Sequence, residues 1–305
     1  MWRPDNPCHS LVPGRFRLDA TLYRQRRGST LRPCVPGSIV FSPGAYADQD
    51  DRGPVLKIVL LHEPVRALLL DIEGTTTPIT YVHETLFPYA RLRVRQFLEQ
   101  PHLSESVSAD LKALHREHLA DVRAALSPPA LDSNSPQSEL ESMVTYIEWL
   151  MVRDRKSTAL KSLQGKIWEE GYHSGNLLAP VFDDVPAAFE RWRAQNRNIA
   201  IFSSGSILAQ ELLFAHTNAG DLTPYISSYF DTTTGAKTDA GSYQKISVSL
   251  ELPPREIGFI SDVTAELDAA AKTVGFQVLF CERVGNRPQP PRPYQRIQDF
   301  NDIFP

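Results

Sequence analysis

The sequence predicts an α/β fold, a doubly wound parallel sheet with an inserted helical cap domain. Short apolar runs recur at residues 65–70, 199–202, 257–260 and 276–280, and helical patterns separate them. Polar or acidic residues follow the first three runs, as expected at the ligand-binding edge of a parallel sheet. The stretch between the first two runs is long and almost wholly helical, which predicts an inserted domain.

The first apolar run ends at two carboxylates two residues apart, Asp71 and Glu73. Gly74 and three threonines follow them. A short apolar run that is bounded by a Gly/Thr turn indicates a buried strand. Because ligands bind at the carboxyl ends of parallel strands, the two carboxylates are placed for chemistry. A carboxylate can also merely cap a loop, so the other strand ends must decide between these two interpretations.

Apolar residues at helical spacing fill the stretch between the first and second strands. We expect Ser104 to cap one helix, and Ser138 with Glu141 to form a capping box before another. After Pro186 the pattern predicts a short helix over residues 187–194, followed by the second strand. The helical stretch is thus the predicted cap.

The chain divides into an extension, a core and a cap. Residues 1–62 are rich in arginine and interrupted by Pro and Gly, so we expect an extension that is disordered or read from an upstream start codon. An organelle transit peptide is the alternative, and residues 55–61 are a candidate extra strand. We expect the core to comprise residues 63–82 and 190–305, and the cap residues 83–189.

The composition is that of a globular protein. With 305 residues, of which 42% are hydrophobic, the chain can bury roughly 75% of its unfolded surface without disulfides. The net charge of −4 favours neither nucleic acid nor an anionic membrane as a partner. No apolar run approaches the ~20 residues of a membrane span, and three cysteines without a CxxC pair predict no disulfide framework or zinc site. We expect a cytoplasmic monomer.

Polar groups of matching chemistry follow the later strands. Ser203 and Ser204 follow the second strand, Lys237 lies in a Gly/Thr loop, and Asp262 ends the strand over 257–261. Alone, the serines and Asp262 suit helix N-caps, and Lys237 suits a solvated lysine. Their order on consecutive elements of one sheet is what indicates a functional site.

This set of residues suits hydrolysis of a phosphate monoester through an aspartyl-phosphate. Asp71 would be the nucleophile, while Glu73 would protonate the leaving oxygen and later deprotonate the attacking water. Both nucleophile and phosphate are negative, so a divalent cation such as Mg²⁺ must offset their repulsion through the carboxylates of Asp71 and Asp262. Ser203 and backbone N–H groups would hold phosphoryl oxygens, and Lys237 would stabilise the transition state.

The order of these groups resembles the haloacid dehalogenase superfamily, which implies a haloacid dehalogenase-like core. Within it, the sequence is similar to the enolase-phosphatases (acireductone synthases) of methionine salvage. The similarity lies in LLDIEGTTTPI at 69–79, LFPYAR at 86–91, WEEGY at 168–172, FSSGS at 202–206, FDT at 230–232, GAK at 235–237, SYQKI at 242–246 and SDVT at 261–264. Glu73 makes the first motif specific, because most of the superfamily has Asp there.

The resemblance implies a Mg²⁺-dependent enzyme with one ion per subunit and a helical cap. It implies enolisation of the phosphorylated diketone 2,3-diketo-5-methylthiopentyl 1-phosphate, followed by dephosphorylation to acireductone (1,2-dihydroxy-3-keto-5-methylthiopentene). The family's magnesium ligands correspond to Asp71, Glu73 and Asp262. Its substrate-contacting residues correspond to Ser203, Ser204 and Lys237.

Several alternatives stay open. The chain could be a related phosphatase of another small sugar phosphate, or a non-catalytic binding protein on the same fold. Lys245 competes with Lys237 for the charge-stabilising role, and we favour Lys237. His115 and His118 lie three apart on a polar helix, which indicates a solvated face rather than a metal site. We interpret three tryptophans as packing residues: Trp149, Trp168 and Trp192. An aromatic residue of the cap is also placed to contact the methylthio group of the substrate.

Overall fold

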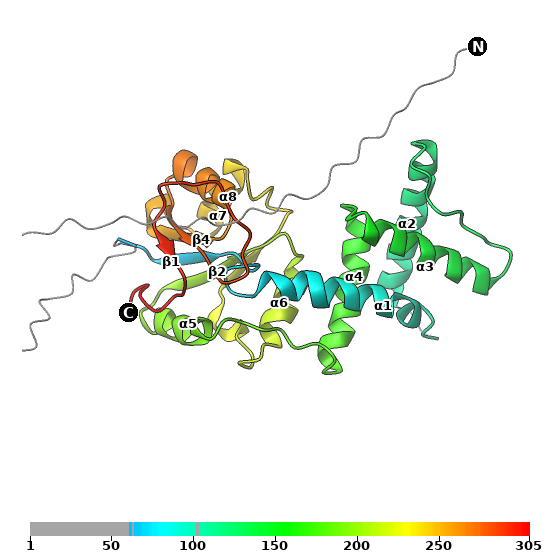
Figure 1. Cartoon of the computed structure of the whole chain (residues 1–305), viewed down its shortest axis with the longest axis horizontal. Helices are drawn as coiled ribbons and strands as arrows, with labels where there is room; N and C mark the ends of the chain where they lie inside the picture. Colours follow the sequence, from blue (N-terminus) through cyan, green and yellow to red (C-terminus); the bar gives the residue numbers. More distant parts are fainter. Residues whose placement is uncertain (1–60, 63, 102–103) are drawn as a thin grey trace, which may run out of the picture. The chain divides into compact units, whose positions relative to one another are not determined.

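A computed structural model describes residues 61–62, 64–101 and 104–305 (Figure 1). Its strands are β1 (Ala67–Leu70), β2 (Asn198–Phe202), β3 (Ser228–Phe230), β4 (Ile257–Ser261), β5 (Gln277–Cys281) and β6 (Arg296–Ile297). Its α-helices are α1 (Phe87–Leu98), α2 (Glu105–Arg123), α3 (Pro136–Val152), α4 (Thr158–His173), α5 (Asp184–Ala194), α6 (Ile207–Ala215), α7 (Ala240–Ser249) and α8 (Thr264–Asp268). Shorter helical segments are η1 (Tyr81–Leu86), η2 (Thr223–Tyr225), η3 (Pro254–Glu256) and η4 (Ala269–Val274). The predicted extension, apart from Leu61 and His62, and most of its candidate strand lie outside the described residues.

The six strands form one parallel sheet in the order β3-β2-β1-β4-β5-β6. Leu70, the last residue of β1, pairs with Ile201 of β2 on one side and Ile260 of β4 on the other. Consequently the loops after β1, β2 and β4 emerge together at the same edge of the sheet. The predicted doubly wound α/β core is confirmed.

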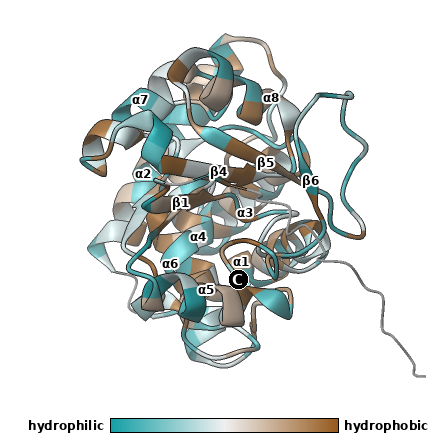
Figure 2. Ribbon diagram, turned by 90° about the vertical axis from the view of Figure 1, so that its left-hand side faces the viewer, coloured by the Kyte–Doolittle hydropathy of each residue, from teal (hydrophilic) through white to brown (hydrophobic). Residues whose placement is uncertain are grey.

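Helices cover both faces of the sheet because the strand side chains alternate. Leu68 and Leu70 of β1 are buried in one apolar cluster with residues of α5 and α6. Ala67 and Leu69 point to a second cluster with residues of α7 and α8. In both views α7 and α8 lie on one face, with α5 and α6 on the other (Figures 1 and 2). Figure 2 shows the apolar strands between these layers.

The helices η1 and α1–α4 are inserted between β1 and α5, and α1, α2 and α3 contact one another or α4. The two ends of this insertion meet, since the Phe182 N–H donates to the Thr76 carbonyl at 3.1 Å. The domain boundaries stay predictions. Helix α5 begins at Asp184, within the predicted cap, and contacts β2 of the predicted core. Before the predicted core, Leu61 is buried and the His62 N–H donates to Gln277 Oε1 at 2.7 Å.

The capping prediction for α3 was wrong by one turn. Pro136 opens the helix and Ser135 is its N-cap, with a Ser135 side chain that accepts from the Ser138 N–H at 3.1 Å. The Ser138 hydroxyl in turn accepts from the Ser135 N–H at 3.0 Å, so Ser138 rather than Glu141 closes the capping box. Proline is tolerated at this first position because its missing N–H would have no helical partner. The predicted cap of α2, Ser104, is confirmed.

Other element boundaries also differ from the prediction. Helix α5 begins at Asp184, three residues earlier than expected, because Pro186 is accommodated in its first turn. The predicted helix after Asp262 continues as the π-helical η4 and ends at Gly275, whose φ of +92° suits glycine. Strands β3 and β6, with three and two residues, were not predicted.

The interpretation of His118 as solvated was wrong, while His115 is exposed. His118 is buried, its Nε2 lies 2.7 Å from the Pro129 carbonyl oxygen, and its ring packs edge-on against Tyr146. It therefore joins α2 to α3 and the loop between them. Trp192 packs as expected, buried in the core.

No helix in the part of the chain that the structure describes is long and apolar enough to cross a membrane.

Candidate active site

The loop after β1 presents Asp71 in a fixed position. The Asp71 N–H donates to the Ile260 carbonyl of β4 at 3.0 Å, which continues the sheet, and Asp71 Oδ1 accepts from the Ile72 N–H at 2.7 Å. Gly74 then turns the chain with φ of +71°. A Cβ at this position would lie 2.6 Å from Asp262 Oδ2, so only glycine lets the loop approach Asp262 so closely.

Lys237 joins the carboxylates at the strand ends. Its Nζ lies 2.6 Å from Asp71 Oδ1 and 2.8 Å from Glu266 Oε2. The Tyr243 hydroxyl donates to the Lys237 carbonyl at 2.6 Å, and the Ser261 hydroxyl donates to Glu266 Oε2 at 2.9 Å. The lysine is thus held from both its main chain and its side chain. In contrast, the competing Lys245 is exposed and donates to a carbonyl oxygen, that of Thr234.

Burial and an excess of carboxyl groups over cations raise the pKa of two carboxyl groups in this cluster, Glu73 and Asp262. Burial, together with the charge of Asp71, raises the pKa of Glu73 to about 7. The same two causes raise the pKa of Asp262 to about 7. Burial opposes the charge on Lys237, but the carboxylates of Asp71 and Glu266 outweigh it and raise the pKa of Lys237 above its ordinary value. Glu73 can therefore exchange a proton near neutral pH.

The loop after β2 brings the predicted serines to the same edge. The Ser203 N–H donates to the Phe230 carbonyl of β3 at 3.1 Å, and its buried hydroxyl accepts from the Gly205 N–H at 3.2 Å. Ser204 is exposed. Ser206 caps α6 through its side chain. The segment therefore offers hydroxyl and N–H groups where a helix begins, a suitable setting for a phosphoryl group.

A cavity of about 410 Å³ lies between these strand ends and the inserted helices. Glu73, Ser203 and Ser204 line it from the sheet, and Lys161 and Trp168 line it from α4. Asp71, Lys237 and Asp262 are not among its lining residues, although Ile72 and Glu73 are. A substrate in this cavity would reach Asp71 past the Glu73 loop.

The predicted metal ligands are brought partly together. Asp71 and Asp262 follow the adjacent strands β1 and β4. The Asp262 carboxylate also lies against Gly74, the residue after Glu73. Within residues 61–62, 64–101 and 104–305, no three His, Cys, Asp or Glu side chains converge as a complete metal site. Mg²⁺ typically binds one or two carboxylates and takes its other oxygens from water and substrate phosphate. Two neighbouring carboxylates in an excess of negative charge fit that mode.

Sequence reasoning missed two residues of the site, Glu266 and Lys161. Glu266 lies in the first turn of α8, four residues after Asp262, and this short separation along the chain was the available signal. Lys161 carried no such signal, because a lysine in an amphipathic helix normally faces water. Only the packing of α4 against α6 and the other inserted helices brings it to the cavity.

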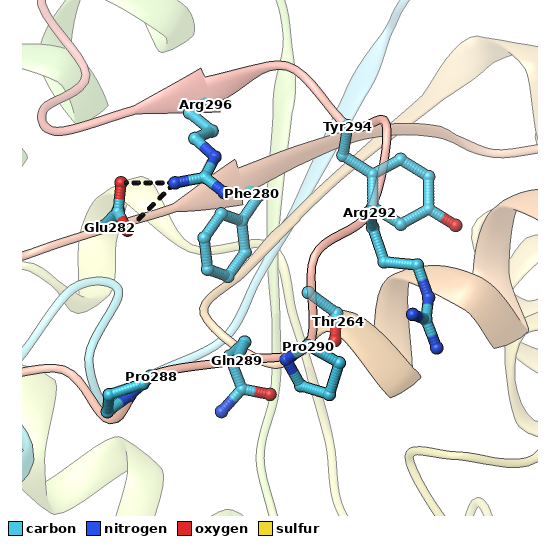
Figure 3. Close-up of a pocket in the computed structure, with 9 residues that line it drawn as sticks. All are labelled: Thr264, Phe280, Glu282, Pro288, Gln289, Pro290, Arg292, Tyr294 and Arg296. Atoms are coloured by element: carbon cyan, nitrogen blue, oxygen red, sulfur yellow. Dashed lines mark hydrogen bonds and ion pairs between the residues drawn. The ribbon is translucent and has the colours of Figure 1, made fainter.

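A smaller cavity of about 130 Å³ lies elsewhere, beside β5 and β6 (Figure 3). Its two arginines are already neutralised. Arg296 pairs with Glu282 at 3.2 Å, and Arg292 pairs with Asp268 at 2.9 Å. It has no excess charge to attract an anionic ligand, so the larger cavity is the candidate active site.

Known proteins resemble the chain in sequence and in structure. Residues 65–272 match the family model described as haloacid dehalogenase-like hydrolase. The chain is 47% identical over 239 residues to Enolase-phosphatase E1 of Synechococcus elongatus, covering 78% of this chain and 98% of that relative. It is 42% identical to Enolase-phosphatase E1 of Drosophila simulans over 72% of this chain and 84% of that one. The crystal structure of the UTR4 protein of Saccharomyces cerevisiae has a TM-score of 0.64, at 35% identity over 78% of this chain and 99% of that chain.

A parallel sheet with the Asp71 loop after its central strand β1, together with this family match, defines the class: a haloacid dehalogenase-like hydrolase. The sequence resemblance to one family within the class is confirmed by relatives that the chain covers almost completely. The chain belongs to the enolase-phosphatase E1 family.

Proposed function

We propose that the chain is an acireductone synthase, which enolises 2,3-diketo-5-methylthiopentyl 1-phosphate and then removes its phosphate. The name of its relatives, Enolase-phosphatase E1, supports both half-reactions. The observation that carries the proposal is the Asp71 carboxylate at the strand end, 2.6 Å from Lys237, with Glu73 beside a cavity of about 410 Å³. The cytoplasmic location and the monomeric state stay predictions.

The phosphatase step divides between two carboxyl groups. Asp71 attacks phosphorus and forms an aspartyl-phosphate, while Glu73 protonates the leaving oxygen. With its pKa raised to about 7, Glu73 holds that proton in a large fraction of molecules near neutral pH. As a carboxylate it then takes a proton from the water that hydrolyses the intermediate. Ser203 and Ser204 hold the phosphoryl oxygens, and Lys237 stabilises their charge.

Magnesium is the cofactor that these residues suit. Asp71 and Asp262 would hold the ion, with Glu73 as the third ligand through a main-chain or side-chain oxygen. When bound, Mg²⁺ offsets the repulsion between the nucleophile and the phosphate and polarises a neighbouring carbonyl. We expect one ion per subunit.

The test is a magnesium-containing assay on the diketone phosphate that follows enol absorbance and free phosphate together. We expect an enol signal that rises and then passes into phosphate release, and loss of activity on chelation with EDTA that magnesium restores. Asp71→Asn should reduce phosphate release by about 10³-fold or more, because it removes the nucleophile.

Other outcomes would contradict the proposal at different levels. Phosphate release from generic esters, with no action on the diketone, would indicate a phosphatase of another small sugar phosphate. An Asp71→Asn variant that binds the substrate and functions as well as the parent would indicate a non-catalytic binding protein. Activity that survives thorough chelation would exclude the metal role of Asp71 and Asp262.

A further inference from the structure

Three cationic residues line the cap side of the cavity, and two of them, Arg155 and Lys156, form ion pairs with Asp121 and Asp154. Lys161 of α4 lines the cavity together with the strand-end residues Glu73 and Ser203. The phosphatase chemistry proposed above uses Lys237 and assigns nothing to Lys161. The question is what an ammonium at this position would bind.

Lys161 is partly desolvated and forms no ion pair within the described residues. Its Nζ donates to the Thr232 hydroxyl at 3.2 Å, and in the described part of the chain no carboxylate lies within ion-pairing distance of it. Burial lowers the pKa of Lys161, and the charge of Asp231 offsets only part of that effect. Lys156, which lines the same cavity, is 86% exposed and pairs with Asp154 at 2.9 Å. A partly buried ammonium with unused donors is stabilised by a ligand oxygen.

The position of Lys161 separates it from the phosphoryl end of the site. Its partner Thr232 follows β3, and β3 pairs with β2, which pairs with the strand of Asp71. Two strand spacings place β3, the strand that Thr232 follows, ~10 Å from the strand that carries Asp71. A phosphoryl group in contact with Asp71 would therefore extend its carbon chain, rather than its phosphate oxygens, toward Lys161.

We propose that Lys161 binds the dicarbonyl part of the substrate and stabilises the enolate in the first half-reaction. This inference rests on the proposed function. In the step, the C–H bond at carbon 1 breaks, its proton passes to water, and its electron pair forms the double bond to carbon 2. The carbonyl π pair moves onto the oxygen at carbon 2, where the Lys161 ammonium donates a hydrogen bond. That oxygen then takes a proton from water and the enol results.

The test compares Lys161→Met with Lys272→Met in the magnesium-loaded, full-length enzyme. Loss of a hydrogen-bond donor to a developing oxyanion typically costs 10²–10³-fold in rate, so enol formation should fall by about that factor in Lys161→Met. Hydrolysis of p-nitrophenyl phosphate, which has no carbonyl, should stay within about threefold of the parent because Lys161 does not contact the phosphate. Lys272→Met should leave both rates within about threefold, since Lys272 lies outside the cavity and its side chain is exposed and paired with Asp268.

Each other result has a distinct meaning. Equal loss on both substrates would overturn the proposal by placing Lys161 at the phosphate or in the folding of the cap, and thermal unfolding of the variant would separate these two. Unchanged enol formation in Lys161→Met would overturn it outright. A parent enzyme that hydrolyses p-nitrophenyl phosphate but leaves the diketone untouched would instead refute the proposed function, and this inference with it.

Discussion

A single ammonium group, that of Lys237, pairs with two carboxylates, Asp71 after β1 and Glu266 in α8. It lies within 2.8 Å of both Asp71 and Glu266, and all three groups are largely buried. Removing its charge would leave these carboxylates uncompensated, which is costly in a site shielded from water. The same charge would face the phosphoryl group in the transition state. Lys237 therefore links the stability of the site to its chemistry.

We expect Lys237→Met to lower phosphate release by about 10²–10³-fold, as loss of a preorganised transition-state charge does. Lys245→Met is the matched control and should stay within about threefold of the parent, because Lys245 is exposed and bonded to the Thr234 carbonyl. Steady-state assays on the diketone phosphate measure both. An inactive Lys245 variant beside an active Lys237 variant would reverse the assignment.

The raised pKa of Glu73 predicts a pH dependence of stability in the magnesium-free protein. Its folded pKa of about 7 lies above the unfolded value of 4.5, so its contribution is full below about pH 4.5 and is lost as the pH rises through 7. A shift of this size corresponds to about 3 kcal/mol at most. Urea unfolding from pH 4.5 to 7.5 should show the parent losing stability relative to Glu73→Gln.

The control for this pH profile is Glu282→Gln. Glu282 is 46% exposed and pairs with Arg296 at the surface, so its variant should follow the parent. Parallel profiles of the parent and Glu73→Gln would show that the Glu73 carboxyl is ionised normally in the folded protein.

Single elements depend on local bonds that a few side chains supply, and α3 is an example. The Ser135 and Ser138 side chains satisfy N–H groups that the first turn of the helix leaves without partners. At the other end of α3, the loop before α4 lines the cavity. Arg155 of that loop is held by Asp121 of α2 at 2.8 Å, and Ser157 donates to Glu117 at 2.6 Å. The cap helices thus position one wall of the site.

Ser135→Ala should lower the free energy of unfolding by about 1 kcal/mol, the typical value of an N-cap. Glu141→Ala should cost less than about 0.5 kcal/mol, because Glu141 lies on the exposed side of the helix and does not cap it. Urea denaturation of both variants measures the difference. A larger loss from Glu141→Ala would favour the capping box that the sequence pattern alone indicates.

Elements with a long or strongly apolar pattern could be predicted from the sequence, and short ones could not. β1 and β4 are wholly buried and bounded by polar turns, so their runs were recognisable. β3 has three residues, two of them only half-buried, and β6 has two; neither length can display a period. In the site, Asp71 was found by its strand-end position and Lys237 by its place in the order of the polar groups. Lys161 was missed because its place at the cavity depends on how α4 packs against other elements.

Across the molecule, one buried arginine joins three regions that are distant in sequence. The Arg283 guanidinium binds both carboxylate oxygens of Asp184 in α5, at 2.7 and 2.8 Å. It also donates to the carbonyl of Thr75 in the loop after β1, and to that of Gln298 near the C-terminus. The loop after β1, which begins with Asp71, is therefore held in place by the C-terminal part of the chain.

Asp184→Asn should destabilise the protein by about 3–5 kcal/mol, because it leaves a buried guanidinium without its anion. Glu282→Gln, which breaks the exposed pair with Arg296, should cost less than about 1 kcal/mol. Thermal and urea unfolding test both. If the Asp184 variant were as stable as the Glu282 variant, Arg283 would not brace the fold.

The hydrogen bond between Phe182 and Thr76 makes the inserted helices a closed excursion that leaves and rejoins the core at one point. Because the entropy of closing such a loop grows only slowly with its length, the insertion can lengthen, shorten or be replaced without disturbing the strand order. Mutation and selection can therefore act on the part of the cavity wall that comes from the insertion while the strand-end carboxylates are inherited unchanged. Changes in the inserted helices can therefore alter which substrate binds, while the strand-end residues keep the same reaction.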